Sequence, residues 1–100
     1  MIDSKLVEFV ENGAWQVAIV SYDISHSVLV LALYRDVFPH REELVCGETF
    51  YFRGETMGGP YELTVREEHV ESGRSICIAS RDESLVIKCL RLAFAHPVGP

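Results

Sequence analysis

Residues 15–34 read WQVAIVSYDISHSVLVLALY, and this stretch decides the predicted fold. Two runs rich in β-branched, aromatic and aliphatic residues, 15–22 and 27–34, flank the polar segment 23–26. This pattern is typical of two strands joined by a hairpin connection. Both runs are apolar at odd and at even positions, and strands of that kind are usually covered on both faces. We therefore expect the two strands to lie at the centre of a sheet.

A short helix is predicted ahead of this hairpin, over residues 3–12. Asp3 is the expected N-cap, because its side chain can accept a hydrogen bond from a free backbone N–H of the first turn. Gly13 is expected to end the helix. The apolar residues of this segment recur at helical spacing: Ile2, Leu6, Phe9 and Val10. A helix of this length is marginal alone, so it must dock on the sheet.

Four more strands are predicted after the hairpin, over residues 44–53, 61–70, 74–80 and 84–94. Clean alternation in 61–70 gives that strand one wet face and indicates a place near a sheet edge or on an open face. In the last strand the apolar phase shifts near Cys89 and Leu90. That shift indicates a β-bulge, or a second half buried on both faces. The connections, including the glycine-rich 54–60, are too short for parallel crossovers, so we expect an antiparallel meander.

The expected fold class is α+β and mainly antiparallel β, with one short N-terminal helix. About six strands would form one curved sheet, a small sandwich or a half-barrel. The chain has 100 residues, which suits one globular domain over 1–96 and a C-terminal tail over 97–100. A domain of this size buries roughly two-thirds of the surface of its unfolded chain. It can therefore fold without disulfides or metal.

The formal net charge of −6 is unevenly distributed. Residues 1–50 carry three basic and eight acidic groups, whereas residues 51–100 carry six and seven. The basic residues are scattered, which argues against a nucleic-acid partner. An acidic surface favours a basic protein partner, as an immunity or antitoxin protein would have, although it can serve solubility alone. The residues predicted to form this acidic face are Asp36, Glu42, Glu43 and Glu48.

Cysteine usage and the N-terminus favour a cytoplasmic location. Cys46, Cys77 and Cys89 make an odd number without a CxxC pair, which is a poor disulfide framework. The chain starts without a basic segment followed by an apolar run, so no secretory signal is predicted. The longest purely apolar run, 28–33, is far shorter than the roughly 20 residues of a membrane helix, so no membrane partner is expected.

Two segments carry the candidate binding residues. Glu67, His69 and Glu71 share one face of an extended strand, where carboxylate and imidazole groups can bind a divalent cation. They lack a second His or a Cys at ligand spacing, so we favour a solvated strand end and expect neither metal nor cofactor. The other segment is the glycine-rich connection, because loops often carry binding function. Its candidate residues are Arg53, Glu55 and Met57.

The sequence favours a non-enzymatic binding or interaction module, and no catalytic residue is predicted. The cysteines lie in apolar strands, where thiols act as small hydrophobic groups, and there is no G-x-S-x-G motif. The alternative is a small-ligand or minor enzymatic domain with its site near 53–61 and the 67–71 strand end. Four aromatic residues are expected in the core: Trp15, Tyr22, Phe50 and Phe52. The apolar surplus of the first two strands favours a homodimer.

Overall fold

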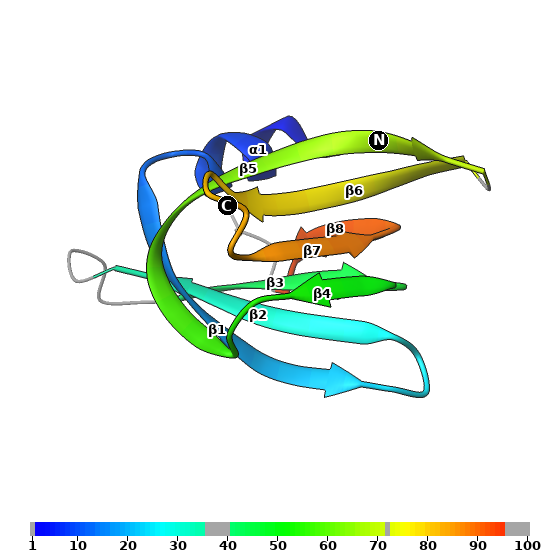
Figure 1. Cartoon of the computed structure of the whole chain (residues 1–100), viewed down its shortest axis with the longest axis horizontal. Coiled ribbons are helices and arrows are strands. Elements are labelled where there is room, and N and C mark those ends of the chain that lie inside the picture. Colours follow the sequence, from blue (N-terminus) through cyan, green and yellow to red (C-terminus); the bar gives the residue numbers. More distant parts are fainter. Residues whose placement is uncertain (1, 36–40, 72, 96–100) are drawn as a thin grey trace.

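The computed structural model describes residues 2–35, 41–71 and 73–95. These residues form one helix and eight strands: α1 (Ser4–Val10), β1 (Ala14–Asp23), β2 (Val28–Tyr34), β3 (Glu42–Gly47), β4 (Tyr51–Arg53), β5 (Met57–Val70), β6 (Gly73–Ser80), β7 (Val86–Cys89) and β8 (Arg91–Phe94). The strands form a single antiparallel open sheet in the order β4-β7-β6-β5-β1-β2-β3-β8 (Figure 1). The predicted class, mainly antiparallel β with one short N-terminal helix, is confirmed. The predicted tail 97–100 lies outside the described residues.

The β1–β2 hairpin lies in the middle of the sheet, as predicted, between β5 and β3. Leu29, Leu31 and Leu33 of β2 are buried on the inner face. The register shifts between Ile19 and Ser21, which marks a bulge in β1. Cover on both faces was predicted, and it is wrong for Val20 next to this bulge, which is 43% exposed.

The predicted meander is confirmed for β5, β6 and β7, which pair in sequence order, and is wrong for its first strand. The segment predicted as one strand over 44–53 is divided into β3 and β4, and neither part pairs with β5. Instead, β5 pairs with β1 along its first half and with β6 along its second half. The connection predicted over 54–60 is too long, because residues 57–60 already belong to β5. Short connections show that strands are antiparallel, but they do not show which strands become neighbours.

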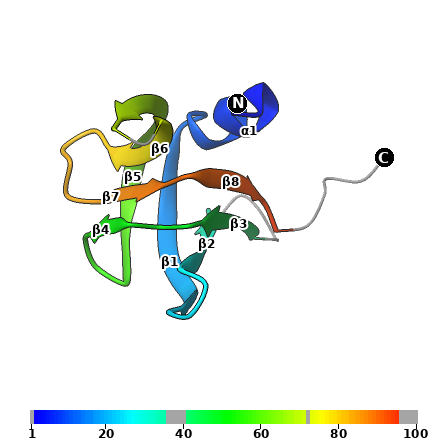
Figure 2. The same cartoon turned by 90° about the vertical axis from the view of Figure 1, so that its right-hand side faces the viewer.

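The sheet curls because the same two chain segments supply strands to both of its ends. One segment contains β3 and β4, and the other contains β7 and β8. At one end β3 pairs with β8, and at the other end β4 pairs with β7. Leu90 alone separates β7 from β8, at the position of the predicted bulge. Across this break the Leu90 N–H donates to the Gly47 carbonyl at 3.1 Å, and the Phe50 N–H donates to the Lys88 carbonyl at 2.9 Å. Figure 2 shows the resulting curvature.

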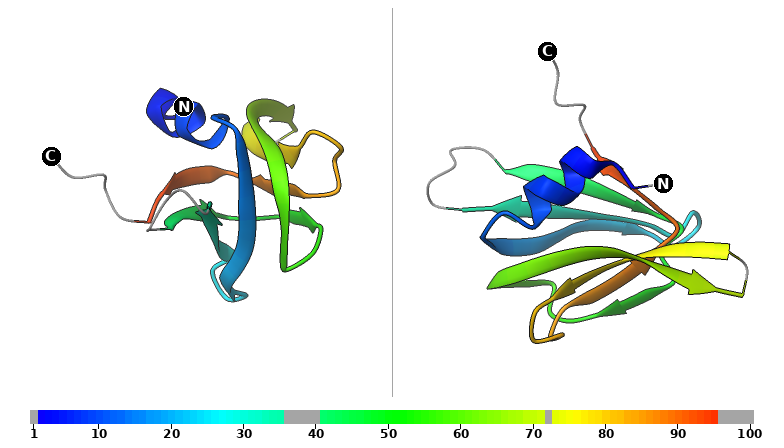
Figure 3. Two further views of the ribbon diagram at one scale, coloured as in Figure 1. Left: turned by 90° about the vertical axis from the view of Figure 1, so that its left-hand side faces the viewer. Right: turned by 90° about the horizontal axis from the view of Figure 1, so that it is seen from above.

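Helix α1 packs at one end of the curled sheet (Figure 3). Asp3 is its N-cap, as predicted, and accepts a hydrogen bond from the Lys5 N–H at 2.9 Å. Leu6 and Val10 are fully buried in the core that fills the inside of the curl. The indole of Trp15 joins helix to sheet, because its Nε1–H donates to the Val10 carbonyl at 2.9 Å. The opposite end of the curl has no such helix among the described residues.

Candidate functional site

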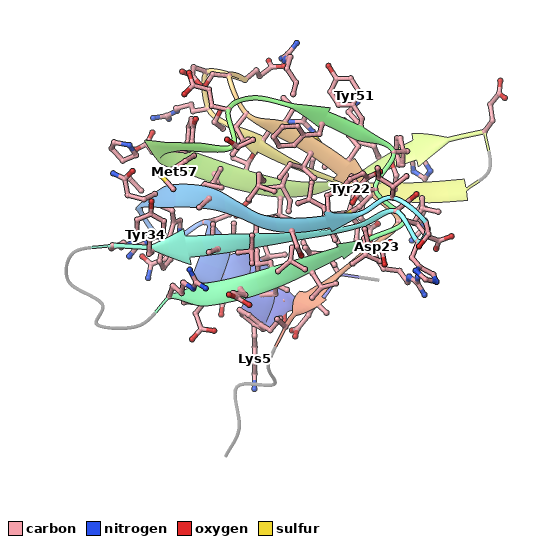
Figure 4. The ribbon with its side chains drawn as sticks, turned by 90° about the horizontal axis from the view of Figure 1, so that it is seen from below. Lys5, Tyr22, Asp23, Tyr34, Tyr51 and Met57 are labelled. Atoms are coloured by element: carbon pink, nitrogen blue, oxygen red, sulfur yellow. The ribbon has the colours of Figure 1, made fainter. Side chains whose placement is uncertain are left out.

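A pocket of about 390 Å³ opens between β4 and the β1–β2 hairpin. We call it the aromatic pocket, and its lining residues are Ile19, Tyr22, Leu29, Thr49, Phe50, Tyr51, Phe52 and Thr56. Four of these eight side chains are aromatic, and none carries a carboxylate, an amine, a guanidinium, an imidazole or a thiol. Figure 4 looks at the molecule from the side opposite α1 and shows Tyr22 on β1 and Tyr51 on β4. The pocket therefore offers apolar contact and the hydroxyl groups of Tyr and Thr.

The walls of the aromatic pocket are tied to the rest of the sheet by backbone hydrogen bonds. Thr49 stands at the junction of β3 and β4, where its N–H donates to the Ser27 carbonyl at 2.7 Å. Its hydroxyl donates to the Cys46 carbonyl at 2.8 Å, so this buried polar side chain is satisfied. On the other side, the Ile19 N–H donates to the Thr56 carbonyl at 2.8 Å. The pocket is thus bounded by segments whose backbones are fixed to one another.

Large apolar groups are left in contact with solvent at the mouth of this pocket. Phe50 is 53% exposed, Tyr22 48% and Tyr51 41%. The prediction that aromatic residues fill the core is therefore confirmed for Trp15, which is 2% exposed, and is wrong for Phe50 and Tyr22. The run of three consecutive aromatic residues, 50–52, already indicated that some of these rings would be exposed. Successive side chains of a strand point to opposite faces, so a single buried face cannot cover all three.

The candidate residues of the glycine-rich segment are sequence neighbours of pocket residues but do not line the pocket themselves. Arg53 is in β4, Glu55 lies in the connection between β4 and β5, and Met57 begins β5. All three are exposed. Met57 pairs with Ala18, whose neighbour Ile19 lines the pocket, so Met57 projects from the other face of the sheet. Phe52 and Thr56, the neighbours of Arg53 and Glu55, are the residues that contribute to the lining.

The second candidate cluster lies at the far end of β5. Glu67 and His69 are exposed and follow the inner-face residues Leu63 and Val65 in phase, as predicted. Glu67 forms an ion pair with Arg74 of β6, in which Glu67 Oε2 lies 3.6 Å from Arg74 Nη1. Glu71 follows the end of β5. Ten residues of extended strand separate Glu67 from Met57, roughly 30 Å along the chain. The structure does not bring the two candidate clusters together into one site.

The predicted acidic face is partly neutralised where the structure describes it. Glu42 and Glu43 begin β3, and a carboxylate oxygen of Glu43 lies 3.1 Å from Arg41 Nη2. Glu48 lies beyond the other end of β3, 3.5 Å from Arg91 Nε. Asp36 lies outside the described residues. These carboxylates are therefore distributed along a strand and are not gathered into one patch.

Nucleophilic chemistry has little support among the described side chains. All three cysteines are buried. A hydrogen bond with Cys89, together with burial, raises the pKa of the Cys46 thiol well above its ordinary value. Burial also raises the pKa of the Cys77 thiol. Both thiols therefore stay protonated, whereas a reactive cysteine needs the thiolate. The hydrogen bond with Cys46 lowers the pKa of the Cys89 thiol, but this side chain is 0% exposed.

Asp23, Ser25 and His26 meet in the turn of the β1–β2 hairpin. The Asp23 carboxylate accepts hydrogen bonds from the Ser25 N–H at 3.0 Å and from the Ser25 hydroxyl at 2.7 Å. That carboxylate and the hydroxyl both contact the same ring nitrogen, His26 Nδ1, each at 3.0 Å. A catalytic relay needs the two imidazole nitrogens to face different partners. The hydrogen bonds of this cluster therefore stabilise the turn and do not form a catalytic relay.

The other hollows and side-chain clusters are weaker candidates for a binding site than the aromatic pocket. Two hollows of about 310 and 580 Å³ near the end of α1 share Glu62 and Arg81, whose charged groups pair with each other at 3.0 Å. The described residues contain no group of three or more His, Cys, Asp or Glu side chains placed to hold a metal ion. They also form no helix that is long and apolar enough to cross a membrane.

Comparison with protein-family models, with curated proteins and with solved structures finds no match.

Proposed function

We propose that this protein is a small binding domain whose aromatic pocket takes the planar, apolar part of a small molecule. The observation that carries the proposal is an apolar, aromatic cavity of about 390 Å³ on a small chain. Pockets that bind small molecules usually measure roughly 300–1,000 Å³ and combine apolar walls with a few polar groups. Thr49, Thr56 and the two tyrosines supply those polar groups here.

Two features of the pocket favour a planar ligand. Aromatic rings interact best with other aromatic systems in offset-stacked or edge-to-face arrangements. Rings on β1 and β4 flank the cavity, so a planar guest can contact both walls. The hydrogen bonds of Thr49 and Ile19 hold these walls in place before a ligand arrives. Preformed walls reduce the entropy lost on binding.

The sequence offered a small-ligand site near 53–61 and the 67–71 strand end as its alternative. The proposed site lies instead between residues 49–56 and the β1–β2 hairpin, and the strand end at 67–71 is not part of it. An acidic surface that binds a basic protein, a homodimer and a cytoplasmic location all stay predictions. Glu43 and Glu48 already form ion pairs within the chain, which does not favour binding of a basic protein.

Fluorescence titration with N-phenyl-naphthylamine, a neutral aromatic dye, tests the proposal. We expect saturable binding with one site per chain. Phe50→Ala should weaken this binding about tenfold, because the substitution removes a ring contact of roughly 0.5–1.5 kcal/mol together with the apolar area that the ring buries. Phe50 is half exposed, so this variant should keep the fold.

Met57→Ala is the matched control, because Met57 is 65% exposed and projects from the other face of the sheet. We expect it to bind the dye as the wild type does. Absence of saturable binding to the wild type would overturn the proposal. Equal weakening by Phe50→Ala and Met57→Ala would also count against it, since the dye would then be recording exposed apolar surface in general.

A further inference from the structure

The outer face of the sheet next to the aromatic pocket carries a cluster of cations. The register aligns Tyr51, Lys88, Cys77 and Arg66 in one row across four strands. The adjacent row contains Arg53, Val86 and Ala79. Three of the nine basic residues of the chain thus meet on one small area of a protein with a net charge of −6.

These cations surround a hollow of about 150 Å³, which we call the basic hollow. Its floor consists of Cys77, Ala79 and Val86, a small apolar cluster in which each residue is at most 5% exposed. Arginine and lysine can lay their alkyl stems along apolar surface while the charged heads stay in water. The small floor and the long rim side chains together produce a depression with positive groups around it.

Few carboxylates lie close to the cations of the basic hollow. Lys88 Nζ lies 3.2 Å from one Glu68 carboxylate oxygen, and Arg66 Nε lies 3.4 Å from the other. The hydrogen bond from Lys88 is the main reason that the pKa of Glu68 is lowered. Arg53 Nη2 donates to the backbone carbonyl of Glu83 at 2.7 Å, so this contact uses no carboxylate. Three cations therefore face the carboxylates of Glu68 and Glu83, and the hollow keeps a positive excess.

Tyr51 lines both the basic hollow and the aromatic pocket. It lies in β4, an end strand of the sheet order, and the Lys88 ammonium lies 5.8 Å from the centroid of its ring. Phe52, the next residue, contributes to the aromatic pocket only, and Arg53 contributes to the basic hollow only. One three-residue strand thus separates an uncharged cavity from a cationic one.

We propose that the ligand is an amphipathic anion, with a planar apolar body in the aromatic pocket and one compact negative group, a carboxylate or its equivalent, in the basic hollow beside Tyr51. This inference rests on the proposed function of the aromatic pocket. The acidic chain repels anions over most of its surface, so local cations decide which acids can bind. Lys88 and Arg53 are the residues assigned to hold the negative group.

Two dyes that share a ring system test this inference. Anilinonaphthalene sulfonate is N-phenyl-naphthylamine with one added sulfonate, so the ratio of their dissociation constants isolates the negative group. We expect the sulfonate to bind the wild type about tenfold more tightly than the neutral dye at low salt. The advantage should shrink as salt is added, because exposed charges are screened. Lys88→Gln and Arg53→Gln should each reduce the advantage severalfold and leave the neutral dye unaffected.

Lys5→Gln is the control, because it changes the net charge equally and Figure 4 shows Lys5 far from Tyr51. Saturable binding of the neutral dye without any advantage for the sulfonate would overturn this inference and leave the proposed function intact. An advantage that survives both Lys88→Gln and Arg53→Gln, or that Lys5→Gln removes equally, would also overturn it. Failure of the neutral dye to bind would overturn the proposed function itself. Thermal unfolding of each variant verifies that the fold is kept.

Discussion

Arg35 joins the helix-to-sheet connection to the core through a single side chain. Its guanidinium carbon lies 3.4 Å from the centroid of the Trp15 ring. Its Nε donates to the Ala14 carbonyl at 2.8 Å, and its Nη2 donates to the Asn12 carbonyl. Partial desolvation lowers the pKa of Arg35, yet arginine remains charged at any ordinary pH. The residue therefore combines cation–π contact with satisfaction of the carbonyls that follow α1.

Arg35→Met should lower the free energy of unfolding by about 1–3 kcal/mol, since it removes the cation–π contact and leaves carbonyls without donors. Arg81→Met is the control, because Arg81 and Glu62 form an ion pair with side chains 83% and 59% exposed. Such surface pairs contribute about 1 kcal/mol or less. Urea denaturation followed by Trp15 fluorescence measures both. Equal effects of the two substitutions would contradict the role given to Arg35.

Asp82 supplies a pH dependence at the turn between β6 and β7. Its carboxylate accepts hydrogen bonds from the hydroxyl and N–H of Ser84 and from the hydroxyl of Ser80, which lowers its pKa to about 2 from 3.8. A lowered pKa in the folded state stabilises the fold above the unfolded value. This stabilisation is lost as the pH falls from about 3.8 towards about 2.

The stability advantage of the wild type over Asp82→Asn should therefore be constant near neutral pH and should disappear on acidification towards about pH 2. Denaturation curves recorded at several pH values measure this difference. The carboxyl carbon signal of Asp82 should titrate with a midpoint well below 3.8 in wild type, and closer to that value in Ser84→Ala. A midpoint near 3.8 in the wild type would refute the proposed hydrogen bonding.

At the scale of elements, β5 changes partners along its length. It leaves β1 at Glu62 and pairs with β6 from Leu63 onwards. Just beyond this change, the Val65 N–H donates to a carboxylate oxygen of Glu11 at 2.9 Å. A side chain that follows α1 thus replaces the strand partner that β5 has lost. Backbone donors need such partners when they are partly buried.

Gly59 allows the close approach of β5 and β1. Its φ of +129° is rare for residues with a side chain, and an added Cβ would lie 2.8 Å from the Trp15 carbonyl oxygen. Gly73 has a similar φ of +134°, and among the described residues no atom beyond its chain neighbours lies within 4 Å of such a Cβ. Both alanine variants should be destabilised by backbone strain, and Gly59→Ala should lose about 1–3 kcal/mol more because of the clash. Equal losses, measured by urea denaturation, would contradict this account.

The identity of the elements could be predicted from the sequence more fully than their pairing. The Asp3 cap, the alternation of Leu63 and Val65, and the phase change at Leu90 each follow from local patterns. The pairing of β5 with β1 depends on how far the whole sheet curls. No connection length or periodicity contains that information, so the meander prediction was wrong for its first strand and correct for β5, β6 and β7. The break between β3 and β4 was missed for the same reason.

At the scale of the whole molecule, the curled sheet has two unlike ends. Helix α1 covers one end with Leu6 and Val10, while the other is lined by side chains of β1, β2 and the 49–56 segment. The sequence showed aromatic residues in strands, which usually means core, and it did not show that the curl leaves them around a cavity. The basic hollow was missed because its three cations are far apart in the sequence and meet only through strand register.

The central claim is that the aromatic pocket binds a planar apolar group, and chemical-shift mapping with indole tests it most directly. Titration of the ¹⁵N-labelled protein should shift the amide signals of Thr49, Tyr51 and Phe52 and those of Ile19 and Tyr22 along one saturable curve. The signals of α1 should remain in place. Shifts confined to other surfaces, or signals that do not move while the protein stays folded, would contradict the account.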